Sequence, residues 1–309
     1  MNFTGIDKIV HGVEDLTECM RFYDDWGLTK ISSDKNSALY KTMDGSEVLL
    51  CHNSDPGLPP AIEEHSTIRH VVWGVENKSN LIKFKNKILN HDTYFELDGN
   101  PACVDPNGLS LSFRVTQRHI VNVKGVSMNT WDKPDARSDQ RSKIYDKAEP
   151  IKIGHVVFFV SDLNAMEKFY TDILGFSVSD RYPGAGIFLR CATPGGHHSL
   201  FILETPDKKV GLNHVAYTVR DIHEVFGGGL QVDRCGWKTQ IGPGRHPVSS
   251  AYFWYVENPA GGLAECFTDE DYCTEKWEVR DFQRSNEAFT EWAVEGGIDF
   301  NTRRQHPSK

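Results

Sequence analysis

One pattern that recurs four times along the chain constrains the fold more than any other feature. An apolar run leads to a polar residue that opens a helix-like segment in IDKIVHGVEDL, IRHVVWGVEN, IGHVVFFVSDL and LNHVAYTVRDI. The first and third copies share one constant offset, 162 − 15 = 147, which aligns Asp15 with Asp162 and Phe22 with Phe169. Such self-similarity indicates one supersecondary unit used several times.

Each copy has the same predicted order of elements. The apolar runs favour buried strands, and Asp15, Asp162 and Asp221 are suitable N-caps for the helices that follow. Short strand-like segments broken by Gly, Pro and Asn come next, as in HSLFILE and SAYFWYVENPAGGLAECF. The chain is therefore predicted to repeat strand, helix and several strands four times, with two units in each domain.

The length of 309 residues suits two domains. A polar stretch, NTWDKPDARSDQRSKIYDKAE, separates the second unit from the third and is the best candidate for a linker. We expect an N-terminal pair of units over 1–130, a linker over 131–149 and a C-terminal pair over 150–309. The last part includes a tail whose aromatic residues are expected to dock onto the body: Trp277, Phe282, Phe289, Trp292 and Phe300.

Composition excludes several classes of function. A net charge of −9 without a Lys/Arg-rich run argues against a nucleic-acid partner. The N-terminal segment carries acidic residues where a signal peptide needs an apolar core, and no apolar run reaches the ~18 residues of a membrane span. Seven scattered cysteines without a C-x-x-C pair fit reduced thiols. We expect a cytoplasmic protein that acts on small molecules and has no membrane partner.

Histidines in the repeated strands suggest a metal site. In three copies a histidine lies seven residues before the helix start, and two of these, His155 and His214, would lie side by side if the third and fourth units form one barrel-like sheet. Glu265, in GLAECF, has apolar neighbours, and a buried carboxylate needs a partner or a metal. Two imidazoles and a carboxylate form the facial triad of non-haem Fe(II) oxygenases, which leaves open positions for substrate and dioxygen.

Three further residues are candidates for acid/base chemistry. His198 begins a predicted strand in GGHHSL, His246 lies in GPGRHP, and Tyr255 precedes Glu265 by ten residues across the NPAGG turn. Imidazoles and a phenol near a metal can move protons to and from a bound hydroxyl. His197, next to His198, is interpreted as its structural partner.

At these positions the sequence resembles the type I extradiol ring-cleavage dioxygenases of the vicinal oxygen chelate superfamily, which include catechol 2,3-dioxygenases and dihydroxybiphenyl dioxygenases. The resemblance covers nearly the whole chain and is most specific in its C-terminal half. The family's metal ligands match His155 in IGHVVFFV, His214 in LNHVAYTV and Glu265 in GLAECF.

The family's catalytic residues also have matches here. Its acid/base histidine matches His198, and its substrate-contacting pair matches His246 and Tyr255. The resemblance implies an α+β fold of four βαβββ modules with a funnel-shaped site in the C-terminal pair. It also implies a homo-oligomer, a tetramer or larger.

The implied reaction is extradiol cleavage of a catecholic ring at non-haem Fe(II), favoured over Mn(II). Both atoms of dioxygen, the co-substrate, enter a hydroxymuconic semialdehyde-type product during aromatic compound degradation. No pair of basic residues stands out as a carboxylate clamp, because Arg245 belongs to a common loop pattern and Arg190 could face either way. An uncharged, substituted or bicyclic catechol is therefore favoured, with a hydroquinone or a trihydroxy-arene as the alternative substrate.

Two other functions are compatible with the same modules. A glyoxalase-type metal-dependent lyase or isomerase normally takes a further carboxylate ligand from the last strand of the partner module. Here that strand is HSLFILE, whose one acid, Glu204, stands at its far end, so the dioxygenase is favoured. A metal-free small-molecule-binding module is the third alternative, but it would have no use for the three candidate ligands.

The histidine of the second copy, His70, is predicted to bind no metal. The equivalent position in the first copy is Lys8, since 15 − 7 = 8. Aligning DPNGLSLSF with ENPAGGLAECF, with one gap in the turn, places Leu111 where Glu265 would be. The N-terminal pair is therefore expected to lack a metal site.

Overall fold

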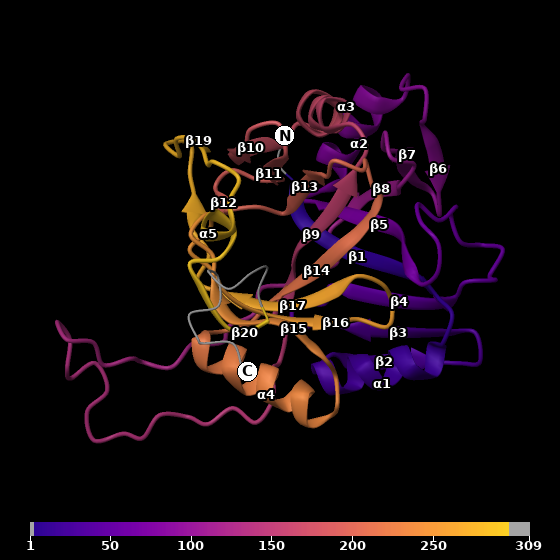
Figure 1. Cartoon of the computed structure of the whole chain (residues 1–309). Helices are drawn as coiled ribbons and strands as arrows, with labels where there is room; N and C mark the ends of the chain where they lie inside the picture. Colours follow the sequence, from indigo (N-terminus) through magenta and orange to yellow (C-terminus); the bar gives the residue numbers. More distant parts are fainter. Residues whose placement is uncertain (1–2, 297–309) are drawn as a thin grey trace.

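The computed structural model describes residues 3–296, which form two large curved mixed sheets (Figure 1) and one small two-stranded sheet. The N-terminal sheet has the strand order β2-β3-β4-β1-β5-β8-β7-β6. The elements of the first module are β1 (Phe3–Val13), α1 (Leu16–Trp26), β2 (Thr29–Ser33), β3 (Ser37–Lys41) and β4 (Glu47–His52). Those of the second are β5 (Thr67–Val75), α2 (Lys78–Ile88), β6 (Phe95–Leu97), β7 (Asn100–Val104) and β8 (Ser110–Val115).

The C-terminal sheet repeats this plan in the order β19-β10-β11-β13-β9-β14-β17-β16-β15-β20. The third module has β9 (Lys152–Val160), α3 (Leu163–Lys168), a π-helical turn η1 (Phe169–Leu174), β10 (Ser177–Tyr182), β11 (Gly186–Arg190), β12 (Gly195–Gly196) and β13 (Leu200–Glu204). The fourth has β14 (Gly211–Thr218), α4 (Ile222–Arg234), β15 (Thr239–Arg245), β16 (Tyr252–Glu257) and β17 (Leu263–Thr268). The tail adds β18 (Tyr272–Cys273), β19 (Arg280–Asp281), α5 (Asn286–Phe289) and β20 (Trp292–Gly296).

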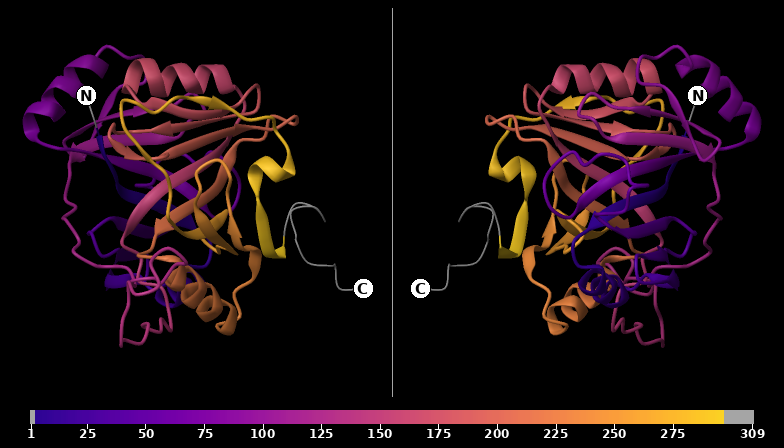
Figure 2. Two further views of the ribbon diagram at one scale, coloured as in Figure 1. Left: turned by 90° about the vertical axis from the view of Figure 1, so that its left-hand side faces the viewer. Right: turned by 90° about the vertical axis from the view of Figure 1, so that its right-hand side faces the viewer.

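The predicted α+β fold of four βαβββ modules is confirmed. In each half the first strands of the two modules pair antiparallel at the centre, β1 with β5 and β9 with β14. Each of these strands also pairs in parallel with the last strand of its own module. The sheets are barrel-like in curvature but are not closed by hydrogen bonds, since β10 and β15 pair with tail strands and not with each other. The tail, in yellow, runs along this open side (Figures 1 and 2).

The predicted helix starts are also confirmed. The carboxylates of Asp15, Asp162 and Asp221 accept hydrogen bonds from backbone N–H groups three residues on, as N-caps do. Asn77 caps α2 in the same way. The four capped helices thus share one position in the repeated frame.

Alternation along the strands separates two environments. In β9, Val156 and Phe158 belong to the main hydrophobic core, whereas His155 and Val157 line a cavity on the concave face. In β17, Ala264 and Cys266 face the core and Glu265 faces the cavity. Successive side chains of a strand point to opposite faces, so one strand can serve both environments.

The two halves share one core between the convex faces of their sheets. Phe176 packs against Phe3 and Trp73 with ring centroids 5.4 and 4.9 Å apart, and Trp26 packs against Tyr217 at 5.9 Å. All five side chains are buried in the same cluster. The halves are therefore expected to unfold together.

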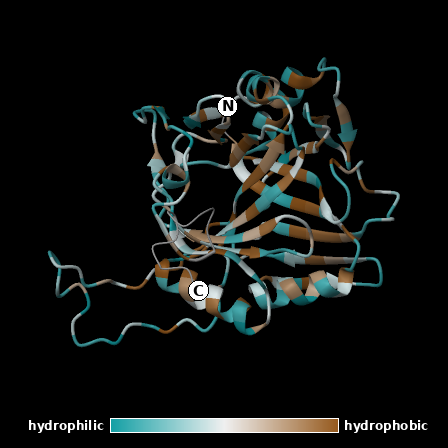
Figure 3. Cartoon of the chain, viewed as in Figure 1, coloured by the Kyte–Doolittle hydropathy of each residue, from teal (hydrophilic) through white to brown (hydrophobic). Residues whose placement is uncertain are grey.

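The segment between β8 and β9 is irregular apart from one isolated bridge between Thr130 and Lys133. It loops away from the body in Figure 1 and is mostly hydrophilic in Figure 3, in contrast to the apolar strands. The irregular part begins soon after Val115 and so is longer than the predicted linker; the domain bounds themselves remain a prediction.

Of the predicted docking aromatics, Phe282 and Phe289 pack against buried clusters, and Phe300 lies outside the described residues. Among residues 3–296, no helix is both long and apolar enough to cross a bilayer.

Replacing Phe176 tests the shared core. Because its ring contacts both halves, Phe176→Ala is expected to lower the free energy of unfolding by about 3–5 kcal/mol in one cooperative transition. Urea denaturation followed by fluorescence measures this change. Ile31→Ala, at a side chain that is 51% exposed, should change the free energy by less than about 0.5 kcal/mol. Two separate transitions, with only one of them shifted, would contradict a common core.

Candidate functional site

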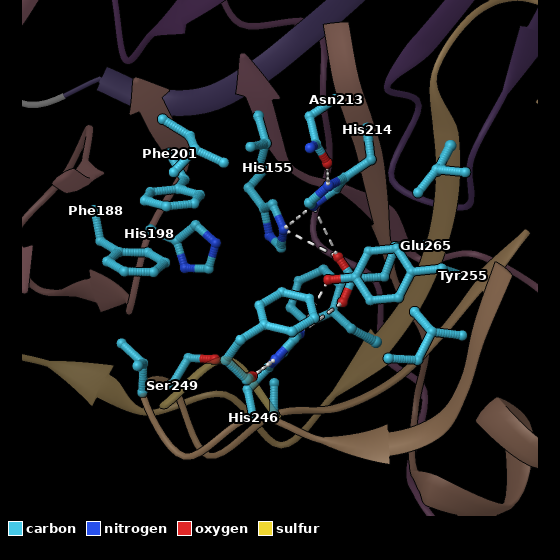
Figure 4. A pocket seen from close by; sticks show the side chains of 18 of the residues that line it. His155, Phe188, His198, Phe201, Asn213, His214, His246, Ser249, Tyr255 and Glu265 are labelled. Atoms are coloured by element: carbon cyan, nitrogen blue, oxygen red, sulfur yellow. Dashed lines mark hydrogen bonds and ion pairs between the residues drawn. The ribbon is translucent and has the colours of Figure 1, made fainter. Parts of the chain in front are cut away.

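Three adjacent strands bring the predicted metal ligands together. Ala216 in β14 pairs with His155 of β9 on one side and with Glu265 of β17 on the other. His214 stands two residues before Ala216 and therefore points to the same face. The side chains of His155, His214 and Glu265 converge in the cavity (Figure 4).

The three ligand atoms form a nearly equilateral triangle. His155 Nε2 lies 3.2 Å from His214 Nε2, and Glu265 Oε2 lies 3.1 and 3.2 Å from these two nitrogens. All three residues are buried. Within residues 3–296 this is the one group of three His, Cys, Asp or Glu side chains close enough to hold a metal ion.

The donor set fits a divalent cation. The Nδ1–H of His214 is used on the side-chain oxygen of Asn213 at 2.7 Å, so its Nε2 presents a lone pair. Glu265 Oε2 is buried without a partner in hydrogen-bonding geometry, although it lies within 3.2 Å of both nitrogens. Three atoms about 2.1 Å from one cation and at right angles around it lie about 3.0 Å apart, close to the distances found here. The observed triangle thus matches one face of an octahedron.

Charge at the site follows from burial and from these contacts. Burial would raise the pKa of Glu265, but the imidazole nitrogens of His155, His214 and His246 outweigh it and hold the pKa well below its usual range. Burial lowers the pKa of His155 to about 4. A negative carboxylate and neutral imidazoles are the states that bind a metal ion.

His198 approaches the triangle from one side. Its ring centroid lies 4.0 Å from that of His155 and 5.2 Å from that of Phe188. Burial lowers the pKa of His198 well below its usual value, and the nearby His155 and His197 add to this effect. The predicted acid/base histidine is therefore neutral and next to the candidate ligands.

His246 and Tyr255 lie on the opposite side. The register pairs Tyr255 with Glu265 across β16 and β17, which accounts for the spacing of these two residues in the sequence. His246 Nδ1 lies 2.7 Å from the Phe289 carbonyl oxygen and must donate to it, so in the neutral ring Nε2, 2.9 Å from the Tyr255 hydroxyl, is an acceptor. Burial and the Glu265 carboxylate raise the pKa of Tyr255 well above its usual value.

All six predicted residues line one cavity of about 500 Å³. Its walls are largely apolar, with the rings of Phe188 and Phe201 stacked at 4.0 Å. The tail closes part of it, because Phe289 of α5 and the adjacent residues contribute to the lining. Figure 4 shows His155, His214 and Glu265 pointing toward one another, with Phe188 and Phe201 beside His198 and Tyr255 on the opposite side.

Several neighbours were missed by the sequence analysis. Asn213 orients His214, and the Phe289 carbonyl orients His246. Asp180 and Arg280 were also missed; His197, the expected structural partner of His198, joins them to that ring. Asn213 could have been suspected from its position beside a ligand. The others come from segments that are distant in sequence and carry no recognisable motif.

The register corrects one sequence alignment. His70 pairs with Ser110 as His214 pairs with Leu263, so the residue equivalent to Glu265 is Ser112 and not Leu111. The gap placed in the turn was wrong: Asp105 and Asn258 start equivalent turns, in which each backbone N–H donates to the carbonyl four residues later. Leu111 faces the core instead.

His70 itself is engaged by hydroxyl groups. Its Nδ1 lies 2.8 Å from Ser110 Oγ and its Nε2 lies 2.7 Å from Ser112 Oγ. Lys8 occupies the frame position of His155, since it pairs with Val72 as His155 pairs with Ala216. That His70 binds no metal remains a prediction, now supported by two occupied ring nitrogens.

The C-terminal half of the chain is similar to known proteins. Residues 152–271 match the model of the Glyoxalase/Bleomycin resistance protein/Dioxygenase superfamily. The match covers 120 of the 309 residues (271 − 152 + 1 = 120) and lies in the C-terminal half. Metapyrocatechase 2 from Cupriavidus necator is 33% identical over 135 residues, which are 43% of this chain and 42% of that protein, so the match spans less than half of either.

Two solved structures share the fold across nearly the whole chain. The Mn(II)-bound glyoxalase from Novosphingobium aromaticivorans has a TM-score of 0.74 at 23% identity, covering 99% of this chain and 95% of that one. The 2,2',3-trihydroxybiphenyl 1,2-dioxygenase from Sphingomonas wittichii has a TM-score of 0.71 at 19% identity, covering 95% and 99%. The chain thus has the vicinal oxygen chelate fold in both halves.

Removing a ligand tests the metal site. His214→Ala and Glu265→Gln are each expected to weaken metal binding by more than about 100-fold, because even the loss of an outer hydrogen-bond partner costs 10- to 100-fold. Calorimetric titration and the metal content after dialysis measure this. His70→Ala is the matched control and should bind as the unchanged protein does. Stoichiometric iron retained by His214→Ala would refute the ligand assignment.

Building the missing ligands into the N-terminal half tests the register. Lys8→His combined with Ser112→Glu should complete a triad around His70 and add a second equivalent of bound Zn(II), measured by titration. The control combines Lys8→His with Leu111→Glu, which places the carboxylate on the core side and should add none. Metal gained only by the control would show that the gapped alignment was right.

Proposed function

We propose that the protein is an extradiol ring-cleavage dioxygenase that inserts both atoms of dioxygen into a catecholic ring. The observation that carries this is the two-histidine, one-carboxylate triangle at the end of an apolar cavity, which leaves the cavity side free for substrate and dioxygen. The resemblance of six site residues to the extradiol family and the match to metapyrocatechase 2 support the same reaction.

His155, His214 and Glu265 would hold the metal, which we propose to be Fe(II) and not Mn(II). When bound, Fe(II) would supply Lewis acidity toward the substrate oxygens and the one-electron chemistry needed to use dioxygen. The ligand set itself suits both metals. The preference for iron follows from the resemblance to the extradiol enzymes.

His246 and Tyr255 would handle the substrate proton. With its Nδ1–H held by the Phe289 carbonyl, His246 offers Nε2 as an acceptor toward the Tyr255 hydroxyl. A substrate hydroxyl near Tyr255 can then lose its proton to this pair. His198, on the other side of the triangle, would exchange a proton with the reacting ring; its ring lies 4.0 Å from that of His155, which supports this role.

The cavity supports an uncharged, substituted or bicyclic catechol as substrate. Phe188 and Phe201 provide a flat aromatic wall beside His198, and Val248 adds to the apolar lining. Such surfaces bind the ring that carries no hydroxyl groups by burying apolar area. By the same resemblance, we infer a homo-oligomer, a tetramer or larger.

A lyase or isomerase of the glyoxalase type is less well supported. The last strand of the third module presents Phe201 and Leu203 to the cavity, where such an enzyme would need a carboxylate. Glu204 is engaged elsewhere, accepting from the backbone N–H of Leu163 at 3.0 Å and pairing with Lys208. The donor set facing the cavity is therefore that of a three-ligand site.

The direct test is anaerobic reconstitution with Fe(II), followed by a panel of catechols under air. A yellow ring-fission product, absorbing in the near-ultraviolet or visible, is expected from at least one substituted or bicyclic catechol, with one equivalent of dioxygen consumed. Reconstitution with Mn(II) in parallel distinguishes the two metals. Absence of product from every catechol with either metal would sink the proposal.

The control for this experiment is Glu265→Gln treated in the same way. It should form no product, because the carboxylate that neutralises part of the metal's charge is gone. Conversion of methylglyoxal–glutathione hemithioacetal by the unchanged protein would favour the lyase instead.

A further inference from the structure

His198 contacts a row of buried, hydrogen-bonded side chains to which the proposed reaction assigns no role. Its Nδ1 lies 3.1 Å from Nδ1 of His197, and Nε2 of His197 lies 2.9 Å from Asp180 Oδ2. His197 and Asp180 are both 0% exposed. Both side chains are therefore shielded from water, and together they connect the His198 ring to Arg280, whose side chain is 43% exposed.

The surroundings hold His197 in place independently of its neighbour. The Ser179 hydroxyl donates to the His197 carbonyl, and the Glu270 carboxylate accepts from the backbone N–H groups of His197 and His198. Trp277, from the tail, packs edge-on against the His197 ring at 5.7 Å. A ring held this firmly can fix the position of the one beside it.

Asp180 is an ionised acceptor whose charge is already matched. Its Oδ2 lies 2.6 Å from the Arg280 guanidinium, and its Oδ1 accepts from the Arg280 backbone N–H at 2.8 Å. Burial would raise the pKa of Asp180, but the hydrogen bonds from His197 and Arg280 outweigh it and lower the pKa. The Arg280 guanidinium, which lies 2.6 Å from Asp180 and 3.9 Å from Asp271, already supplies Asp180 with a counter-charge, so a buried cation on His197 would be only partly compensated.

These contacts determine which nitrogens carry protons. An ionised Asp180 can only accept, so the neutral His197 must carry its proton on Nε2 and leave Nδ1 bare. The contact between the two Nδ1 atoms then requires a proton on His198 Nδ1. That leaves His198 Nε2, on the other side of the ring, as an acceptor for the cavity.

We propose that His197, oriented by Asp180 and Arg280, is a positioning residue that fixes the ring orientation and the Nδ1–H tautomer of His198. This rests on the proposed function, in which His198 exchanges a proton with the substrate. In the resting protein the Nε2 lone pair of His198 therefore faces the cavity.

The tautomer of His198 can be measured by NMR without an activity assay. In metal-free full-length protein labelled with ¹⁵N-histidine, long-range ¹H–¹⁵N correlation distinguishes Nδ1–H from Nε2–H rings, and His198→Gln identifies the signal. The Nδ1–H pattern is expected for His198. In His197→Phe, which removes the acceptor, and in Asp180→Asn, which no longer fixes the His197 proton, both tautomers are expected.

Steady-state kinetics distinguish a positioning role of His197 from a general loss of stability. His197→Phe should lower kcat on the catechol cleaved fastest by about 10- to 100-fold, with metal content and KM nearly unchanged. His197→Asn, whose side-chain oxygen can replace the Nδ1 acceptor, should recover most of the loss. His70→Asn, at the buried histidine of the other half, is the control for stability and should leave kcat unchanged.

The outcomes are distinct. An Nε2–H tautomer of His198 in the unchanged protein, or an unaltered Nδ1–H tautomer in both His197→Phe and Asp180→Asn, would overturn the proposal. Equal loss of kcat in His197→Asn and His197→Phe would also count against it. Failure of every catechol to react would refute the proposed function, while the tautomer measurement would still decide the role of His197.

Discussion

The site depends on the pairing of Ala216 with two neighbours at once. Because His155 and Glu265 stand directly across from it on β9 and β17, the side chain between them must be small for their polar ends to meet. Gly154 makes a similar contribution, since a Cβ there would lie 2.5 Å from the Phe267 ring that packs against His155. Backbone register and two small residues therefore bring the triangle together before any metal binds.

Equivalent positions in the two halves satisfy their buried polar groups in different ways. In the N-terminal half the ring nitrogens of His70 meet the hydroxyls of Ser110 and Ser112, so that its polar groups are satisfied within the protein. In the C-terminal half Glu265 Oε2 has no such partner. A buried ionised carboxylate is costly unless it is paired. We infer that the second arrangement is stable with a cation and the first without one.

Much of this could be predicted from sequence, because the repeat carries strong local signals. The first and third copies are related by a constant offset of 147 residues. The helix caps and the candidate ligands lie in or beside hydrophobic strands with clear periodicity. The alignment of Leu111 with Glu265 was wrong because it matched Phe113 to Phe267 and therefore needed a gap in the turn. The two turns are in fact equivalent and need no gap. Strand register is set by the hydrogen bonds of the turn and ladder, and a slip of one residue reverses the face of every side chain.

What could not be predicted is the contribution of the tail, and this separates two properties of the site. The triad comes from β9, β14 and β17 alone, whereas the groups that orient the acid/base residues, the Phe289 carbonyl and Arg280, come from the tail. The same tail covers both edges of the sheet through β19 and β20, which protects unpaired backbone groups. The candidate metal ligands thus come from the third and fourth modules, while groups that orient the candidate acid/base residues come from the segment that follows them. Changes in the tail can therefore alter catalysis without altering the ligands, which is a physical route by which one metal-binding scaffold can support different reactions.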